Sequence, residues 1–496
     1  MSFLDLASEV LNITETEKGD KAFKTSNNSC LDYFYMVGGK RNDVEGVLSL
    51  FIRAFLDEPK TALKLLLFTR DIKGGLGERK LFRYLLVMLA KYESETAKLL
   101  IPSIVKYGRY DDLLCLIGTP LEDDVIALIK KQLVEDLKNK KDGKSISLLA
   151  KWLPSINTSK DEARATALYL AEKLGLSKAD YRKALSFLRK GLIIENNLRE
   201  KDYSFNYESV PSSAMNNYRK AFERNDKKRF KDYIKKVEKG EAEMNIGVLD
   251  IVTFIKRAQE AMSKSEEADY YEATWKKLVE ESVINSKTLV VRDGSGSMYS
   301  YWPNPNIMPI HIANALTLLT AARLTGEFKD KFITFSNDSE IVDMSSKKTL
   351  FQKLLYLESF DDCGTTNVQS VYHMIIDVYK HPNFKKEDAI EQIMFVSDME
   401  FDQLRDRSGR PSNLSNLEYF KNEFDKLGYK MPTVIFWNVA SRGKKVPVTS
   451  NEYGVKLISG GSKNIIDMVI NTKSIDPLDF MYKALEPYAF IDELIK

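Results

Sequence analysis

The clearest structural signal in this chain is one stretch, Thr288-Leu289-Val290-Val291-Arg292-Asp293-Gly294-Ser295-Gly296-Ser297-Met298. Its apolar, β-branched beginning predicts a buried strand that ends at Asp293. Ser295 and Ser297 follow in a turn, where Gly294 and Gly296 permit backbone angles that a Cβ would resist. One carboxylate and two hydroxyls can therefore converge beyond the carboxyl end of a strand, where ligands bind in open α/β sheets. Hard oxygen ligands without a neighbouring Cys or His favour Mg²⁺ or Mn²⁺ over zinc.

Two later stretches extend this pattern. The first is Cys363-Gly364-Thr365-Thr366-Asn367, and the second is Ile393-Met394-Phe395-Val396-Ser397-Asp398, another buried-strand pattern that ends in Asp. With the Asp-x-Ser-x-Ser spacing, they resemble the metal-ion-dependent adhesion site (MIDAS) of von Willebrand factor A domains. The resemblance implies a Rossmann-like α/β fold that binds Mg²⁺ or Mn²⁺. The alternative is a degenerate A domain whose first loop is only a turn.

The resemblance also assigns roles to individual residues. It implies that Ser295 and Ser297 coordinate the metal directly, and that Asp293 and Asp398 contact it directly or through water. Thr366 would be the loop ligand, with the preceding threonine in its place if the loop is offset by one.

The last of these strands departs from the family pattern. A domains often have Thr-Asp-Gly there, whereas this chain has Ser397-Asp398-Met399-Glu400. Glu400 adds a carboxylate whose role the sequence does not define. The missing glycine predicts a stiffer loop.

The region from residue 286 to 475 alternates strand-like and helical patterns. Such alternation implies crossover connections and a mostly parallel sheet covered on both faces, which agrees with the A-domain resemblance. The expected strands are Thr288–Val291, Lys331–Phe335, Glu340–Met344, Gln392–Val396, Thr433–Val439 and Val455–Ser459. Residues 476–496 are expected to form C-terminal helices that dock on the rest.

Residues 1–285 are expected to be almost wholly helical. Apolar residues recur at helical spacing, and glycine or proline breakers separate segments of roughly the length of paired helices. Serial short helices of this kind suggest a curved α-helical repeat (HEAT-like) domain. The predicted architecture is therefore a helical repeat domain followed by an α/β A-like domain.

Composition sets few limits on function. The net charge is only +3 over 496 residues, so any surface that attracts nucleic acid must be local. The three cysteines are far apart, no run of about 18 apolar residues occurs, and no signal peptide is visible. These features predict a cytoplasmic protein without a membrane partner.

Four stretches of the helical part place basic residues beside aromatics or glycines. Three are short: Thr69–Lys80, Lys106–Asp112 and Lys151–Ser155. Each one alone is better explained as a solvated connector between helices, and the first lacks the ending of a Walker phosphate loop. The fourth, Tyr218–Lys239, is denser in charge, and RNA contact there competes with a solvated amphipathic helix. Its candidate RNA-binding residues are Arg219, Lys220, Arg224, Lys227, Lys228, Arg229 and Lys231.

The order of a helical-repeat part and an A domain is similar to the Ro autoantigen family, whose repeats form a ring and bind structured and single-stranded RNA. Over nearly its whole length, the chain more closely resembles an uncharacterised family of A-domain proteins, a domain of unknown function. The motifs that carry this second resemblance include Arg70–Arg79, Lys106–Leu113, Lys151–Ser155, Val210–Phe222 and Ser397–Asp402.

These observations favour a non-enzymatic RNA-binding protein of Ro-like architecture with a divalent-metal site. No histidine general base stands near the oxygen cluster in the sequence, because His311 and His373 fall on helical segments where packing roles are commoner. The alternative is a metal-dependent protein-binding scaffold, or an adaptor for an ATPase machine, whose partner donates a carboxylate to the metal. Salt-dependent co-purification of RNA would favour the first interpretation, and RNA-free co-purification of an acidic partner the second.

Overall fold

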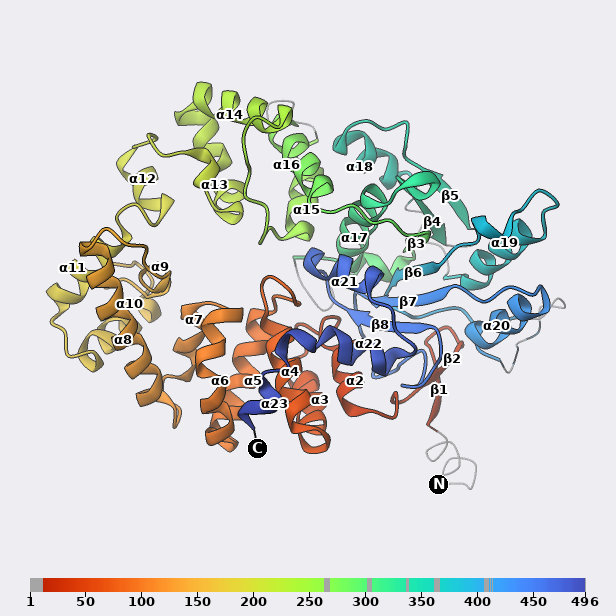
Figure 1. Cartoon of the computed structure of the whole chain (residues 1–496), viewed down its shortest axis with the longest axis horizontal. Coiled ribbons are helices and arrows are strands. Elements are labelled where there is room, and N and C mark those ends of the chain that lie inside the picture. The colour runs from red at the N-terminus through yellow and green to blue at the C-terminus, as the bar shows by residue number, and fades with distance from the viewer. Residues whose placement is uncertain are drawn as a thin grey trace.

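The computed structural model of the chain describes residues 12–262, 268–300, 306–335, 339–360, 366–405, 410, 412 and 414–495. Its C-terminal part is built on a six-stranded sheet with the strand order β5-β4-β3-β6-β7-β8 (Figure 1). Only the edge strand β5 is antiparallel to its neighbour. The strands are β3 (Thr288–Asp293), β4 (Lys331–Phe335), β5 (Glu340–Asp343), β6 (Gln392–Ser397), β7 (Thr433–Asn438) and β8 (Val455–Ser459).

The predicted mostly parallel sheet is thus confirmed, and its sequence explains it. Every residue of β6 and β8 is buried, which is expected of parallel strands covered on both faces. The parallel pairing of β3 with β6 sets Arg292 beside Val396, so both strands end at the same edge of the sheet. That edge carries Asp293 and Asp398.

Helix α17 (Pro309–Arg323) is rich in apolar residues and has no polar face, and all of its residues except His311 are buried. It lies between the sheet and the last two helices of the N-terminal part, α15 (Ile251–Ala261) and α16 (Ala268–Glu280). The other helices of the sheet region are α18 (Leu350–Glu358), α19 (Val368–Lys380), α20 (Asn416–Lys426), α21 (Ile466–Asn471), α22 (Pro477–Ala484) and α23 (Ile491–Leu494).

The N-terminal part is a chain of helices in which many neighbours pack against one another, as α2 to α7 do in succession. Many of these helices are amphipathic and begin after a breaker or a capping side chain, as in α3, where Asp43 accepts a hydrogen bond from the backbone N–H of Gly46. The first eight are α2 (Ser29–Met36), α3 (Val44–Asp57), α4 (Pro59–Arg70), α5 (Arg79–Tyr92), α6 (Ser94–Tyr107), α7 (Tyr110–Leu113), α8 (Glu122–Lys141) and α9 (Leu149–Trp152). Five more precede α15: α10 (Asp161–Lys173), α11 (Lys178–Arg189), α12 (Ile194–Glu200), α13 (Ser212–Asn225) and α14 (Lys227–Lys239).

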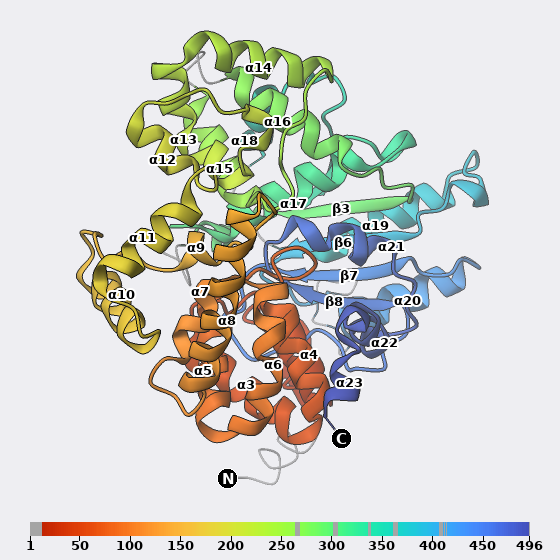
Figure 2. The ribbon, with the colours of Figure 1, turned by 60° about the vertical axis from the view of Figure 1, so that its left-hand side comes forward.

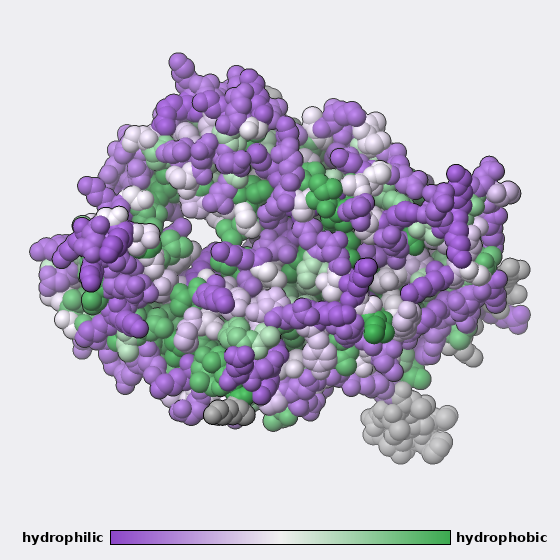
Figure 3. All heavy atoms as spheres, viewed as in Figure 1, coloured by the Kyte–Doolittle hydropathy of each residue, from purple (hydrophilic) through white to green (hydrophobic). Residues whose placement is uncertain are grey.

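These helices follow an arc that starts and ends at the sheet (Figure 1). Figure 2 shows α10, α11 and α12 linking the lower helices of the arc to the upper ones. At one end α2 packs against β8, and at the other α15 and α16 pack against α17. The chain therefore forms a closed ring, and the space-filling view in Figure 3 shows an opening through it.

The contact between α2 and β8 is unusually close and is called the seam here. A Cβ on Gly38, which follows α2, would lie 2.6 Å from the backbone of Ser459 and Gly460 at the end of β8. The backbone N–H of Gly38 also donates to the Ser459 hydroxyl at 3.0 Å. The C-terminal helices reinforce the seam, because α22 packs on β8 and α2 while α23 packs on α4.

The beginning of the chain differs from the prediction that residues 1–285 are almost wholly helical. Strands β1 (Ile13–Glu15) and β2 (Lys21–Phe23) form an antiparallel hairpin. The hairpin docks on loops of the sheet region, where Gly19 pairs with Asp402 and Phe23 with Val446. Its strands are three residues each, too short to give a period in the sequence. Among the described helices, none is both long and apolar enough to span a membrane.

Candidate functional site

Four of the five predicted metal ligands form a connected group at the carboxyl ends of β3 and β6. Asp293 is fully buried and accepts hydrogen bonds from the backbone N–H of Ser295 at 2.8 Å and the Ser397 hydroxyl at 2.5 Å. The hydroxyl oxygens of Ser295 and Ser297 lie 3.0 Å apart. We call Asp293, Ser295, Ser297 and Asp398 the oxygen cluster.

The two carboxylates of the cluster repel each other. Burial, together with the charge of Asp398, raises the pKa of Asp293 to about 6. The side chain of Asp398 is also fully buried, and its carboxylate accepts a hydrogen bond from Arg442 at 3.2 Å. Arg442 donates to the carbonyl oxygen of Ser297 as well, at 2.9 Å. A cation from the loop after β7 therefore bridges both sides of the cluster.

Thr366, the predicted loop ligand, is occupied elsewhere. Its hydroxyl donates to the carbonyl oxygen of Glu400 at 2.7 Å and accepts from the Lys18 ammonium at 2.9 Å. Lys18 belongs to the turn of the β1–β2 hairpin. The preceding threonine, the alternative ligand, lies outside the described residues.

Glu400, whose role the sequence left undefined, holds the same hairpin. Its carboxylate accepts from the backbone N–H of Glu17 at 2.6 Å and lies 4.0 Å from the Lys445 ammonium. Burial raises the pKa of Glu400. The carboxylate of Glu17 in turn lies 3.6 Å from Arg442. Hairpin and oxygen cluster are thus tied together through Glu17, Glu400 and Arg442.

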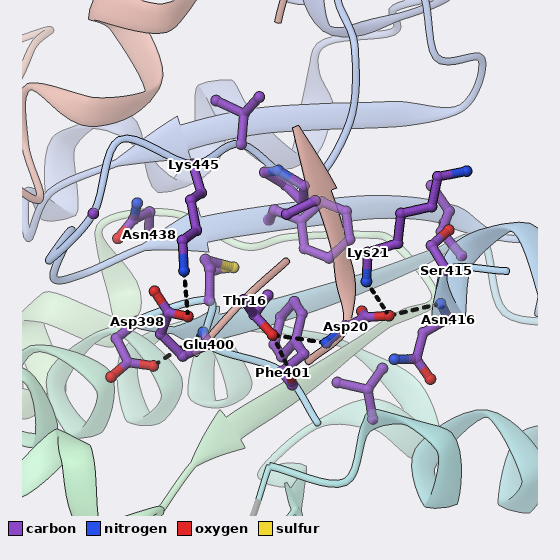
Figure 4. Close-up of a pocket in the computed structure, with 18 of the residues that line it drawn as sticks. Thr16, Asp20, Lys21, Asp398, Glu400, Phe401, Ser415, Asn416, Asn438 and Lys445 are labelled. Atoms are coloured by element: carbon purple, nitrogen blue, oxygen red, sulfur yellow. Dashed lines mark hydrogen bonds and ion pairs between the residues drawn. The ribbon is translucent and has the colours of Figure 1, made fainter. Parts of the chain in front are cut away.

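The hairpin and the loop after β6 enclose a small cavity (Figure 4). Among the residues that line the cavity are Asp20, Asp398, Glu400 and Lys445, which are labelled in Figure 4. Its volume of about 40 Å³ has room for water molecules but not for an organic substrate. Burial raises the pKa of Asp20 to about 6.

The oxygen cluster fits a hard divalent cation in part. Adjacent ligands of an octahedral Mg²⁺, each about 2.1 Å from the ion, are about 3.0 Å apart. The separation of the Ser295 and Ser297 hydroxyls matches this value. Among the described residues, no group of three or more His, Cys, Asp or Glu side chains is placed to hold a metal ion. A metal at this edge therefore depends on hydroxyl ligands, and it competes with Arg442 for Asp398.

The seven candidate RNA-binding residues lie on α13 and α14, but they are not equivalent. Arg219 is only 7% exposed and packs over the rings of Tyr270 and Tyr271 at 5.8 and 5.0 Å. Arg229 is exposed, yet it donates to the carbonyl oxygens of Tyr203 and Phe205 and thereby holds that segment. The exposed remainder is Lys220, Arg224, Lys227, Lys228 and Lys231.

Sequence reasoning missed Lys18, Glu17 and Arg442. Arg442 follows a third parallel strand, β7, which ends at the same edge as β3 and β6, so the topology rule used for Asp293 could have found it. Lys18 and Glu17 gave no signal, because only docking of the hairpin brings them to the site.

A ring of helices closed by a mostly parallel α/β sheet, with an oxygen cluster at the carboxyl edge, defines the class of this protein. Within that class, the chain belongs to the family described as domain of unknown function DUF2828, which matches residues 16–132 and 120–287, more than half of the chain. A second domain of unknown function, DUF7788, matches residues 287–486. The expected membership of a family of unknown function is thereby confirmed.

The chain is also similar to an uncharacterized protein of Acanthamoeba polyphaga mimivirus. The two are 26% identical over 522 residues, which cover 96% of this chain and 88% of the relative. The similarity therefore extends over both the helical part and the sheet.

Proposed function

We propose that this protein is a non-enzymatic RNA-binding protein of Ro-like architecture, with a HEAT-like helical part and a von Willebrand factor A domain that carries a divalent-metal site. The observation that carries the proposal is the closed ring of helices and sheet (Figure 1), with an opening through it (Figure 3) and lysines along α14 that are exposed. The chain as a whole is nearly neutral, so phosphate groups can be bound only where basic side chains are concentrated. The lysines of α14 form such a local basic surface. Two free thiols in the described part, Cys30 and Cys115, support a cytoplasmic location.

The metal-binding part of the proposal rests on the oxygen cluster. Ser295 and Ser297 would hold Mg²⁺ or Mn²⁺ by their hydroxyls, and Asp293 and Asp398 by their carboxylates. Bound there, the ion would supply an exchangeable position for a carboxylate or a phosphate oxygen of a partner. The strand order, with one antiparallel edge strand, supports the A-domain assignment.

A binding role is favoured over catalysis by the surroundings of two histidines. His311 caps its own helix, where its Nδ1 accepts the backbone N–H of Met308 at 3.1 Å. His373 packs edge-on against Phe420 on α20. Both are engaged in packing or capping, which favours a structural role for these two histidines over a catalytic one.

The alternative function, a metal-dependent protein-binding scaffold or an adaptor for an ATPase machine, is supported by Glu17. Its carboxylate reaches Arg442 at the rim of the oxygen cluster from a separate segment of the chain. An acidic side chain of a protein partner could approach by the same route.

The salt dependence of RNA binding tests the leading proposal. Replacing Lys227, Lys228 and Lys231 with Gln should weaken binding of a single-stranded RNA, and the negative slope of log affinity against log salt should become shallower by about 2, or roughly 0.7 per phosphate contact. Arg229 is left intact because it holds backbone carbonyls. A matched control replaces the exposed Lys178, Arg182 and Lys183 of α11 with Gln. Equal losses in the two triple variants would contradict a specific role for α14, and no RNA binding by the unaltered protein would favour the scaffold.

The metal is tested separately. Ser295→Ala with Ser297→Ala should remove the rise in melting temperature on adding Mn²⁺, while RNA affinity stays nearly unchanged. Loss of RNA binding in this variant would instead make the metal itself the nucleic-acid site.

A further inference from the structure

Three stretches that are far apart in the sequence meet on the ring. They are the end of α4 with the start of α5, the junction of α6 and α7, and α9. Each one alone is readily explained as a solvated connector, but together they form one cluster. We call Arg70, Arg79, Arg83, Arg109 and Lys151, with Trp152, the arginine cluster.

Asp112 organises the cluster from within. It is fully buried, and its carboxylate accepts from Nε of Arg70 at 2.7 Å and from Nε of Arg83 at 2.7 Å. It also accepts from the backbone N–H of Arg109 at 2.9 Å. Gly108 is required beside it, because a Cβ there would lie 2.6 Å from the Asp112 carboxylate.

Positive charge exceeds negative charge in this cluster. It has five cations, four arginines and one lysine, against the two carboxylates of Asp111 and Asp112, a surplus of three. The nearby Glu78 is paired with Arg41 at 3.0 Å. Within the described part of the chain, Nη2 of the buried Arg70 has no hydrogen-bond partner. Burial, with the charges of Arg70 and Arg79, lowers the pKa of Arg109.

A flat aromatic surface adjoins this charge. The Arg109 guanidinium lies 4.4 Å from the centre of the Trp152 ring, and the Lys151 ammonium lies 5.4 Å from it. Arg189 fixes α9 by donating to the carbonyl oxygens of Ala150 at 2.7 Å and Leu153 at 2.6 Å. Trp152 is half-buried and Arg79 is exposed, so both are accessible to a ligand.

Two of the helices at the cluster, α7 and α9, border the opening of the ring (Figure 1 and Figure 3). Figure 1 shows α7 and α9 on its edge, whereas α14 lies at the outer rim. Helices α7 and α9 also pack against each other. The arginine cluster is therefore a second basic surface, separate from the lysines of α14.

We propose that the arginine cluster binds one nucleotide unit, with its phosphate held by Arg79 and Arg109 and its base against Trp152. Guanidinium groups bind phosphate through paired N–H donors, and aromatic rings stack bases of any sequence. The inference deepens the proposed function, because the unit would belong to a single-stranded RNA. A free nucleoside phosphate has the same chemistry and is separated from RNA by the experiment.

The experiment measures binding of ADP, of inorganic pyrophosphate and of a single-stranded RNA 15-mer to the full-length protein. Arg79→Gln and Arg109→Gln together should weaken RNA binding about tenfold or more, because two charge-assisted contacts are lost. Trp152→Leu should weaken RNA binding about tenfold and leave pyrophosphate binding unchanged. Arg182→Gln with Lys183→Gln is the control for charge alone, and far-ultraviolet circular dichroism with thermal unfolding checks that each variant is folded.

The outcomes separate this inference from the proposed function. If ADP binding depends on the cluster while RNA does not bind at all, the nucleotide site stands, its ligand is free nucleotide and the RNA-binding proposal fails. If RNA binding is lost only in the α14 variant, and Arg79→Gln with Arg109→Gln bind all three probes normally, the nucleotide site is overturned. Equal losses for RNA and pyrophosphate in Trp152→Leu would overturn the role of Trp152 as a base-stacking surface.

Discussion

Met399 adopts a backbone angle φ of +66° in the loop between Asp398 and Glu400. Bulky residues seldom enter this left-handed region, which is strained by about 1–3 kcal/mol. The loop is held there by hydrogen bonds from the backbone N–H of Met399 to the Ser397 hydroxyl, at 3.0 Å, and from the backbone N–H of Glu400 to Asp398, at 3.3 Å. Strain is thus concentrated beside the oxygen cluster, at the position where A domains often have glycine.

A pair of glycine substitutions measures this strain. Met344 is fully buried, Met399 is 8% exposed, and Met344 lacks the positive φ, so Met344→Gly should lower the free energy of unfolding by about 3 kcal/mol or more. Met399→Gly loses a similar side chain but relieves the backbone, and should be less destabilising by about 1–2 kcal/mol. Urea denaturation of the two variants gives the comparison. Equal losses would show that the loop is unstrained.

Arg442 competes with any metal ion for Asp398. Arg442→Met should therefore raise the affinity for Mn²⁺ about tenfold, because an opposing positive charge is removed from the oxygen cluster. Isothermal titration with Mn²⁺ measures the change, and Arg182→Met on α11 serves as the control. Weaker Mn²⁺ binding in Arg442→Met would mean that the arginine positions the loop instead of competing.

For individual site residues, the sequence predicted position best where a side chain follows a buried strand. The parallel pairing of β3 with β6 brings Asp293 and Asp398 together. This pairing was predictable, because each Asp follows an apolar run typical of a buried strand. Thr366 and Lys18 could not be placed in this way. Their contact depends on docking between segments 348 positions apart, and nothing local to either residue encodes it.

Among the elements, β8 contains a buried lysine. Lys456 is 3% exposed, and its ammonium donates to Gln392 at 3.0 Å and to the carbonyl oxygen of Val469 at 2.7 Å, near the C-terminus of α21. A cation at that end of a helix is favourable. Burial nevertheless lowers the pKa of Lys456 from 10.5 to about 8. The sequence identified β8 by its apolar neighbours but gave no sign that its lysine was inside.

This lysine predicts how stability depends on pH. Between pH 8 and 10.5 the unfolded chain keeps the proton that the folded chain has lost, so the free energy of unfolding rises with pH over this window. The full rise is about 3 kcal/mol. Lys456→Met should remove it, whereas the exposed Lys183→Met should not. Denaturation at pH 7.5 and 10.5 tests this, and equal pH dependence in the two variants would contradict it.

Elements were predictable in proportion to their length and burial. The five parallel strands of the sheet were recognisable as apolar runs, and α17 as a long apolar segment, whereas the short and mostly exposed β5 was recognised from only two apolar residues between acidic ones. The β1–β2 hairpin was missed, because its strands gain their stability from neighbours such as Val446 instead of from their own pattern.

For the whole molecule, ring closure was beyond the reach of sequence reasoning. It depends on contacts between distant parts of the chain, such as Gly38 with Ser459 and the Tyr488 hydroxyl with Asp71 at 2.9 Å. The other end of the helical part is also bonded to the sheet region, because Arg323 of α17 donates to the carbonyl oxygen of Leu278 on α16 at 2.7 Å. Both ends of the helical part are therefore anchored to the sheet.

A single methyl group tests the closure. Gly38→Ala places a Cβ against backbone at the seam, where no side chain can move aside, and should lower the free energy of unfolding by about 3 kcal/mol or more. Gly247→Ala meets no atom within 4 Å and should change it by less than about 0.5 kcal/mol. Thermal unfolding compares the two, with small-angle X-ray scattering to detect opening. If Gly38→Ala left the free energy of unfolding unchanged, the backbones of α2 and β8 would be farther apart at the seam than the structure shows.

The seam is held by packing and hydrogen bonds, with no covalent link between the helix and the strand that meet there. A linear polymer with a free end could thread such a ring, whereas one that is circular, or blocked at both ends, could be encircled only after the seam parts. Entry for such polymers would then be limited by how often α2 separates from β8, and not by diffusion. The ring would in this way distinguish strands by their ends as well as by their chemistry.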